Sequence, residues 1–250
     1  MNNEGNFMKE QFIRTEMVLG SDAMDTLSRS HVLVVGLGGV GSYAAEVLAR
    51  AGVGRLTLVD QDTVSISNLN RQLEALHSTV GMPKAEAVAA RCRDIHPEIQ
   101  AQPLCMSYDA QHRFSSWDFD YIVDAIDLVS CKLDLIEQAL GHKVPIISAL
   151  GTGNKLDPSH LCITDLSKTS VCPLARVMRR ELRARGIEHL KVVYSPEPAA
   201  QPLPLEAPPP GRRSVPASVP WVPSCAGLMM GGAVVMDLIH FGKKGDSLCK

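Results

Sequence analysis

The chain has 250 residues, a formal net charge of −2 and a hydrophobic fraction of 45%. This balance excludes attraction to nucleic acid through overall charge, so any basic surface must be local. The length is sufficient for one large domain with a real core. The seven cysteines include no C-x-x-C pair, which argues against a four-cysteine zinc site and predicts reduced thiols in a cytoplasmic protein.

Strand and helix patterns alternate through the first two thirds of the chain. Apolar strand patterns occur at residues 31–35, 55–60, 119–124 and 144–150. Helical patterns occur at residues 9–29, 40–52, 83–94 and 131–142. We therefore expect a helical N-terminal segment over 1–30, followed by an α/β core over 31–165. The alternation predicts a Rossmann-like, doubly wound, mostly parallel sheet with helices on both faces.

The pattern changes after residue 165. We expect a basic insert over 166–195, with a helix over 173–189. Ten of the sixteen prolines lie in residues 196–223, which predicts a long mobile loop. A Ser-Cys-Ala-Gly turn then leads into an apolar helix, so residues 224–250 form a C-terminal extension that completes the single domain. This apolar run contains Asp237 and is shorter than the roughly 20 residues of a membrane span, so we expect no transmembrane segment.

A glycine cluster, VVGLGGVGS over 34–42, joins the first strand to a helix. Gly36, Gly38 and Gly41 fit the spacing G-x-G-x-x-G. Glycines let the backbone approach a phosphate, and a helix N-terminus supplies free N–H groups. Asp60 ends the second strand, where a carboxylate can accept hydrogen bonds from both ribose hydroxyls. Together these features predict a nucleotide site and leave the nucleotide open.

The polar segments that follow favour a triphosphate over a nicotinamide cofactor. They read DQDTVSISNLNRQ over 60–72 and VGMPKAE over 80–86. Arg71 can clamp phosphate oxygens in a forked geometry, and Lys84 is a second cation at a helix start. Asn68 and Gln72 add neutral donors. Asp127 follows a central parallel strand, where a carboxylate opposite a triphosphate is a natural Mg²⁺ ligand.

Five motifs together resemble the adenylation domain of the ubiquitin-activating and ThiF-like superfamily. They are GxGGxGS, LVDxD, SNLxRQ, VGxPKAE and DxxD, and the resemblance covers about residues 10–155. It implies that residues 31–165 form an adenylation core that binds ATP and Mg²⁺. It implies nucleotide contacts from Gly36, Gly38, Gly39, Gly41, Asp60, Asp62, Asn68 and Gln72. The catalytic residues are then Arg14, Arg71, Lys84 and Asp127, with Asp127 also positioning the metal.

The same resemblance implies a homodimer. Arg14, within IRTEMVLG, matches an arginine that such homodimers insert into the partner's active site, and Met17 stands where a second arginine is common. The implied chemistry is attack of a substrate carboxylate on the α-phosphate of ATP, which releases pyrophosphate and leaves an acyl-adenylate. Catalysis of that step depends on positioning and charge stabilisation.

The second half of the sequence narrows the choice of substrate. Sulfur-carrier adenylyltransferases usually have two C-x-x-C pairs, which are absent here. The stretch TDLSKTSVCPLA over 164–175 and the later VVYS instead resemble the bacterial tRNA threonylcarbamoyladenosine dehydratase branch, although Cys172 stands where that motif usually has Asp. This branch implies ATP-dependent cyclising dehydration of threonylcarbamoyladenosine in tRNA, by ring closure on the activated carboxylate with release of AMP.

A basic stretch supports an RNA substrate independently. Between Lys168 and Lys191 there are seven basic and two acidic residues, a local charge of about +5. The predicted tRNA-binding arginines are Arg176, Arg179, Arg180 and Arg183. Three of them follow i, i+4, i+7 spacing and so share a helix face, which can contact phosphates without reading sequence. A solvated helix face is the alternative.

Several alternatives stay open. Cys225 aligns with a cysteine of the dehydratase branch. It is either a thiol made reactive by a helix start or a small buried residue. The competing functions are an adenylyltransferase for a ubiquitin-like sulfur carrier, an NAD-dependent dehydrogenase and a non-catalytic tRNA-binding protein. The apolar C-terminal helix, with Gly231 and Gly232, is a candidate dimer interface or peripheral membrane contact. A sulfur-relay protein is a further candidate partner.

Overall fold

The computed structural model describes residues 4–205 and 217–241. This part contains a seven-stranded sheet with the order β3-β2-β1-β4-β5-β7-β6. The strands are β1 (His31–Val35), β2 (Arg55–Val59), β3 (Gln100–Leu104), β4 (Tyr121–Asp124), β5 (Ile146–Ala149), β6 (Cys162–Asp165) and β7 (Lys191–Tyr194). The α-helices are α1 (Glu4–Leu19), α2 (Ser21–Arg29), α3 (Gly41–Arg50), α4 (Lys84–Ile95), α5 (Val129–Gly141), α6 (Pro173–Arg183) and α7 (Trp221–Phe241). Every neighbouring pair of strands is parallel except β6 and β7, so the predicted mostly parallel α/β fold is confirmed.

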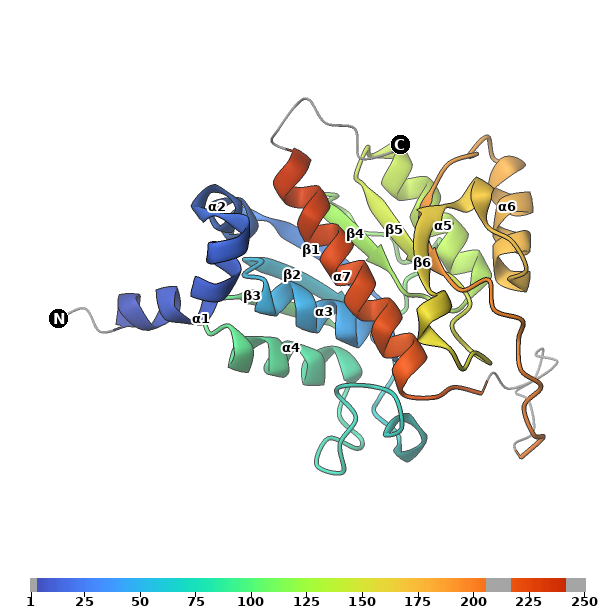
Figure 1. Cartoon of the computed structure of the whole chain (residues 1–250), viewed down its shortest axis with the longest axis horizontal. Helices are drawn as coiled ribbons and strands as arrows, with labels where there is room; N and C mark the ends of the chain where they lie inside the picture. Colours follow the sequence, from blue (N-terminus) through green and yellow to red (C-terminus); the bar gives the residue numbers. More distant parts are fainter. Residues whose placement is uncertain (1–3, 206–216, 242–250) are drawn as a thin grey trace.

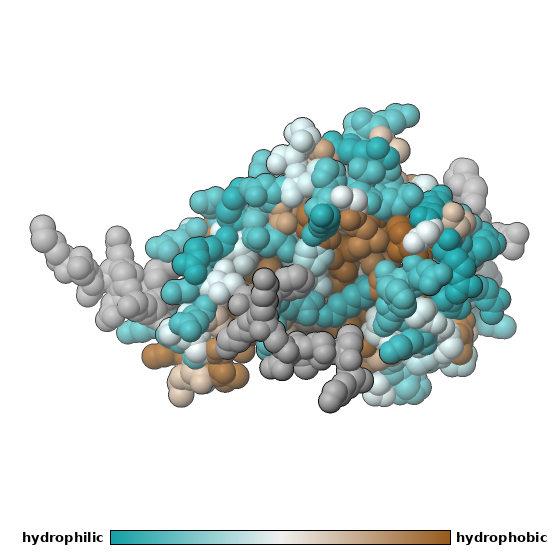
Figure 2. All heavy atoms as spheres, turned by 90° about the horizontal axis from the view of Figure 1, so that it is seen from above, coloured by the Kyte–Doolittle hydropathy of each residue, from teal (hydrophilic) through white to brown (hydrophobic). Residues whose placement is uncertain are grey.

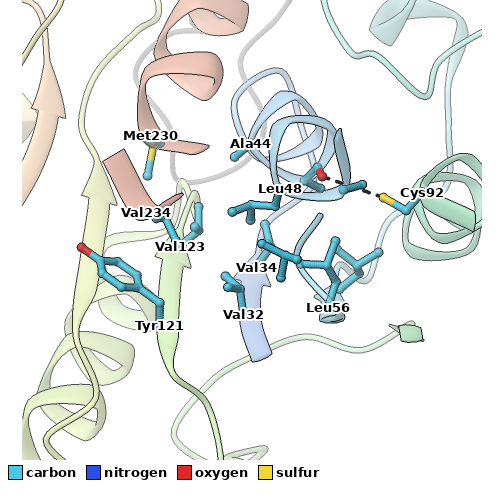
Figure 3. Close-up of a cluster of buried hydrophobic side chains, with 14 of the residues drawn as sticks. Val32, Val34, Ala44, Leu48, Leu56, Cys92, Tyr121, Val123, Met230 and Val234 are labelled. Atoms are coloured by element: carbon cyan, nitrogen blue, oxygen red, sulfur yellow. Dashed lines mark hydrogen bonds between the residues drawn. The ribbon is translucent and has the colours of Figure 1, made fainter. Parts of the chain in front are cut away.

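The central strand β1 is buried on both faces because its side chains alternate between two cores. Val32 and Val34 pack with residues of α3, α4 and α7 (Figure 3). Leu33 and Val35 pack with residues of α5 and α6. This double burial explains why the strand is an unbroken apolar run in the sequence. Figure 1 shows α3 and α7 across one face of the sheet, with α5 and α6 behind it.

Helix α7 packs closely against α3. A Cβ on Gly227 would lie 2.3 Å from the Val40 carbonyl oxygen, and one on Gly231 would lie 2.6 Å from the Val47 Cβ. Gly231 therefore serves packing inside the chain, which corrects its prediction as part of an outer interface. Nothing lies within 4 Å of a Cβ on Gly232, so only this second glycine faces open space.

The expectation that the apolar run is too short for a membrane span is wrong. Helix α7 has 21 residues, and by length and composition the window Trp221–His240 is sufficient to cross a membrane. Half of that window is nevertheless buried inside the protein. The Asp237 carboxylate in this helix accepts hydrogen bonds from the Tyr121 hydroxyl at 2.6 Å and from the Lys191 ammonium at 2.7 Å. These contacts make α7 part of the protein's own core.

Three helix boundaries differ from the sequence predictions. A glycine or a proline lies near each of them. The pattern over 9–29 is divided into α1 and α2 at Gly20, whose φ of 86° is a left-handed conformation. The basic helix α6 ends at Arg183 rather than at 189, and Gly186 follows with a φ of 77°. The predicted turn at 224–227 is helical, because α7 begins at Trp221 and accommodates a proline in its first turn.

Neither edge strand of the sheet has a clear strand signal in the sequence. β3 contains Pro103, which an edge strand tolerates and a central strand does not. β6 is only partly buried along its length. β7 pairs with β5 and so brings the segment over 166–195 into the same sheet as the core.

The proline-rich segment is held beside one loop. Residues 196–205 and 217–220 form no helix or strand, and the remainder of the predicted loop lies outside the described residues. The Ala200 N–H donates to the Asn154 carbonyl oxygen, and the Ala217 N–H donates to the Asn154 Oδ1, both at 2.8 Å. Asn154 therefore binds both described parts of this segment, 196–205 and 217–220, next to the end of the sheet.

The outer surface is mostly polar. Seen from above, hydrophilic residues cover most of the visible face, and apolar residues gather near its middle (Figure 2). On α1, which extends away from the body of the protein (Figure 1), Met17 and Val18 are each 81% exposed. These two neighbours therefore leave apolar surface of α1 open to solvent.

Candidate active site

The chain leaves β1 and β4, the central neighbours of the sheet, in opposite directions. From β1 it continues to β2 on one side, and from β4 it continues to β5 on the other side. The loops that follow two such neighbouring strands run apart, and a crevice opens between them. In open α/β sheets, ligands bind in this crevice. A cavity of about 750 Å³ lies there, within the usual range for a small-molecule site. The sequence-predicted residues that line it are Gly36, Gly38, Gly39, Asp60, Asp62, Asn68, Arg71, Gln72, Lys84 and Asp127.

The glycine loop is shaped by contacts with neighbouring backbone. Gly36 has a φ of 86°, and a Cβ there would lie 2.6 Å from the Ala125 carbonyl oxygen. A Cβ on Gly41 would lie 1.7 Å from the Gly36 carbonyl oxygen. Gly41 does not line the cavity. A glycine is needed there because α3 begins in close contact with the loop backbone. Gly39 is crowded by the protein itself, because its Cβ would lie 3.2 Å from Pro223.

Two carboxylates and a buried cation follow β2. Asp60 accepts hydrogen bonds from the Leu37 N–H at 2.7 Å and from the Asp62 N–H at 2.8 Å. Burial raises the pKa of Asp60, and these two donors oppose the shift. A carboxylate has about four acceptor sites, so Asp60 retains capacity for ribose hydroxyls. Asp62 forms a 3.0 Å ion pair with the Lys84 ammonium, which lies at the first residue of α4.

The polar residues after Asp62 are arranged by a short 3₁₀-helix, η1 (Ile66–Asn68). The buried Asn68 side chain accepts from the Ser65 N–H at 3.0 Å through its oxygen, which leaves its amide nitrogen as the available donor. The Arg71 guanidinium donates to the Ser67 carbonyl oxygen at 2.9 Å. Gln72 is buried, and its side-chain oxygen has no hydrogen-bond partner among the described residues. This loop therefore offers the Asn68 amide nitrogen and the Arg71 guanidinium as donors, and the Gln72 side-chain oxygen as an acceptor.

A fully buried ionic triad supports the loop that carries Asp127. The Lys132 ammonium on α5 donates to the Asp124 carboxylate at 2.6 Å and to the Ser148 hydroxyl at 3.0 Å. That hydroxyl also donates to Asp124 at 2.6 Å, and all three residues are 0% exposed. Asp124 in turn accepts from the Ile126 N–H at 3.1 Å. The triad thus joins the ends of β4 and β5 and fixes the backbone next to Asp127.

The cavity is also lined by residues outside the sequence motifs. The loop after β5, residues 151–155 with the sequence GTGNK, lines one side of it. Lys155 in this loop is only 3% exposed. Cys172, the residue before α6, lines the same side and is buried. A glycine-containing stretch directly after a parallel strand is the signal by which this loop can be found.

Two predicted site residues lie away from the cavity. Arg14 is exposed on α1 and is not among the residues that line the cavity of its own chain. Cys225 lies one turn inside α7, packs partly against the core and does not line the cavity. The structure therefore removes the basis for a thiol at a helix start, since α7 begins at Trp221.

The four predicted tRNA-binding arginines on α6 differ in their surroundings. Arg179 donates to the Thr169 carbonyl oxygen at 2.7 Å and is partly buried, so it has a structural role. Arg180 forms a 2.7 Å ion pair with Glu181. Arg176 and Arg183 are exposed, and neither has an ion-pair partner within the described ranges. A basic face is therefore present, and its unpaired charges are fewer than the sequence indicates.

The cysteines of the described residues form no metal centre. Six of the seven cysteines lie in the described part and all are free; Cys249 lies outside it. Burial raises the pKa of Cys92 to about 12, which keeps that thiol protonated. No group of three or more His, Cys, Asp or Glu side chains suited to a metal occurs within residues 4–205 and 217–241.

Comparisons with known proteins assign the family. The ThiF family model matches residues 11–241. The chain belongs to the ThiF family. The chain is 44% identical to the tRNA threonylcarbamoyladenosine dehydratase of Bacillus subtilis over 246 aligned residues. The alignment covers 93% of this chain and 96% of the relative. The adenylation-domain resemblance of the sequence is thus confirmed.

Solved structures and a second group of relatives add detail. The fold is similar to the crystal structure of the Escherichia coli tRNA N6-threonylcarbamoyladenosine dehydratase TcdA in complex with ATP, with a TM-score of 0.84 and 32% identity. That match covers 95% of this chain and 97% of the other. The chain is also 41% identical to the Escherichia coli molybdopterin-synthase adenylyltransferase, but only over 128 residues, 51% of each protein. The second match therefore concerns half of the molecule.

Proposed function

We propose that this ThiF-family protein is an ATP-dependent tRNA threonylcarbamoyladenosine dehydratase. The observation that carries the proposal is the cavity between β1 and β4, which brings Asp60, Lys84 and Asp127 from three separate segments to one site. The chain is similar over nearly its whole length to proteins named as dehydratases, and this similarity supports the choice of substrate. The sulfur-carrier alternative rests on a match to half of the chain.

The first step is formation of an acyl-adenylate. A carboxylate oxygen of the substrate attacks the α-phosphorus of ATP, and the bond to pyrophosphate breaks. The loop backbone from Gly36 to Gly39 and the donors of Asn68 and Arg71 hold the phosphates, while Asp60 holds the ribose. Lys84 and Arg71 stabilise the negative charge that develops on the phosphate oxygens. No protein nucleophile is needed.

The second step closes a ring. A nitrogen of the substrate's own carbamoyl group attacks the activated acyl carbon, AMP leaves, and the nitrogen loses its proton. ATP cleavage thereby takes up the water that the nucleoside loses. The cavity walls contribute by holding the two ends of one substrate together and excluding solvent.

Mg²⁺ fits this site without a dedicated cage. Mg²⁺ is typically held by one or two carboxylates together with substrate phosphates, and the Asp127 carboxylate lines the cavity on the β4 side. When bound, the ion would neutralise phosphate charge during attack. Asp127 is the residue that we propose to hold it.

We propose that tRNA lies across the exposed arginines of α6 and that the active enzyme is a cytoplasmic homodimer. Arg176 and Arg183 are the exposed cations available for phosphate contacts. Arg14 lies on α1 beside the exposed Met17 and Val18. An apolar helix face around an arginine that is remote from its own cavity supports insertion of that arginine into a partner's site.

AMP release tests the proposal. The protein is incubated with ATP, Mg²⁺ and tRNA that carries threonylcarbamoyladenosine, the same tRNA without the modification, or a ubiquitin-like sulfur carrier. We expect AMP only with the modified tRNA, and Arg71→Ala should remove it. ATP–pyrophosphate exchange that responds to the carrier and not to the tRNA would establish the alternative instead.

A further inference from the structure

Lys155 is a buried cation on the wall of the cavity. It is 3% exposed and lies in the loop after β5. Its ammonium donates a hydrogen bond to the Glu197 carbonyl oxygen. Within the described ranges it makes no ion pair with a carboxylate, in contrast to Lys84, which is paired with Asp62. The charge of Lys155 is therefore not balanced by the protein.

Glu197, whose carbonyl oxygen accepts from Lys155, has its carboxylate bound elsewhere. The Glu197 carboxylate accepts hydrogen bonds from the Leu156 N–H at 3.0 Å and from the Asp157 N–H at 3.2 Å. It lies beyond ion-pair distance of the Lys155 ammonium. A buried charge is costly unless it is paired, so an ammonium that lines a cavity without a carboxylate favours a ligand that supplies the anion.

The position of Lys155 separates it from the nucleotide groups. The glycine loop and Asp60 follow β1 and β2, whereas Lys155 follows β5, on the other side of the switch point. The proposed nucleotide contacts extend from these loops across the switch point to Asp127 after β4. Lys155 lies one strand further out, after β5, so we assign its anion to the second substrate.

The loop that carries Lys155 is fixed by the residue before it. Asn154 has a φ of 58°, and its N–H donates to the Ala217 carbonyl oxygen at 2.8 Å. Its own carbonyl oxygen and side-chain oxygen accept from Ala200 and Ala217. A left-handed asparagine with these three bonds holds the backbone of the loop, so the ammonium next to it is positioned before any ligand arrives.

We propose that Lys155 binds the carboxylate of the threonylcarbamoyl group and so selects the modified tRNA. This inference rests on the proposed function. The ammonium attracts the carboxylate to the β5 side of the cavity, from where one of its oxygens faces the α-phosphate. A charge-assisted hydrogen bond of this kind contributes about 10-fold to 100-fold in affinity.

Equilibrium binding of two tRNAs tests Lys155. Affinities are measured with α,β-methylene-ATP present, so that no turnover occurs, for tRNA with threonylcarbamoyladenosine and for the same tRNA without it. Wild-type protein should prefer the modified tRNA by about 10-fold or more. Lys155→Gln, which keeps a donor for the Glu197 carbonyl oxygen, and Lys155→Met should reduce this preference to near unity. Lys143→Met, at the exposed opposite end of β5, is the matched control.

Each other outcome contradicts the proposal in a recognisable way. Equal loss of affinity for both tRNAs would assign Lys155 to backbone phosphates. Weaker binding of the ATP analogue would assign it to the nucleotide. An unchanged preference in Lys155→Gln, with a lower melting temperature, would leave it a structural residue. The proposed function fails separately, if wild-type protein releases no AMP with modified tRNA.

Discussion

Glu74 has a carboxyl group whose ionisation weakens the fold. The residue is 3% exposed, so its carboxyl group is almost completely removed from water. Burial raises the pKa of Glu74 from its ordinary 4.5 to about 7, and its own backbone N–H, the charge of Lys84 and the Ser42 hydroxyl oppose only part of this shift. The folded protein therefore binds this proton more tightly than the unfolded chain does.

The sign and size of the effect follow from linkage. Below pH 4.5 the carboxyl is protonated in both states and contributes no pH dependence. As pH rises through 4.5 and towards 7, the unfolded chain loses its proton first, so the free energy of unfolding falls. Each pKa unit corresponds to about 1.4 kcal/mol. The full loss is then about 3 kcal/mol, of which about 2.5 kcal/mol occurs between pH 5 and pH 8.

Urea unfolding of wild type and Glu74→Gln at pH 5 and pH 8 measures this loss. The amide has its own burial cost, but that cost is the same at both pH values and cancels in the comparison. Stability should fall with pH by about 2.5 kcal/mol less in the variant than in wild type. Glu188→Gln, at an exposed position, should behave as wild type. Identical pH dependence in wild type and Glu74→Gln would show that Glu74 does not bind its proton more tightly in the folded state.

Three further substitutions test the site and its surface. Lys132→Met leaves a buried carboxylate unpaired and should lower the free energy of unfolding by about 3–5 kcal/mol in urea titrations; a change under 1 kcal/mol on that scale would contradict the ionic triad. Gly41→Ala places a Cβ 1.7 Å from backbone, so calorimetry should show loss of ATP binding or of the fold. Arg176→Ala with Arg183→Ala should weaken tRNA binding and reduce its salt slope by about 1–2. Arg179→Ala, the matched control, should lower the melting temperature and leave that slope unchanged; the opposite pattern would contradict the assignment.

The sequence predicts those parts of the site that local motifs encode. A glycine loop between a strand and a helix, and an acid at the next strand end, are fixed by near-neighbour geometry, and Asp60 and Lys84 do line the cavity. The central strands are also predictable, because burial on both faces makes them continuous apolar runs. Edge strands such as β3 and β6 lack this signal, since one side of each is unpaired.

The remaining features depend on contacts between distant segments. Lys155 donates to a carbonyl group 42 residues away in the chain; the glycines before it mark the loop, but nothing local predicts that its ammonium is buried. Arg179 has the same sequence signal as Arg176, yet its bond to Thr169 gives it a structural role. The role of Gly41 is likewise set by the carbonyl oxygen of Gly36 and not by a ligand. Tertiary packing thus decides between functional and structural roles that the sequence alone cannot distinguish.

The most direct test of the dehydratase proposal is the mass of the nucleoside that the protein produces. Modified tRNA is incubated with the protein, ATP and Mg²⁺, digested without base, and examined by mass spectrometry. We expect a nucleoside lighter than threonylcarbamoyladenosine by one water, formed together with one AMP and one pyrophosphate, and not formed by Asp127→Ala. Threonylcarbamoyladenosine of unchanged mass, with or without AMP release, would contradict the proposal.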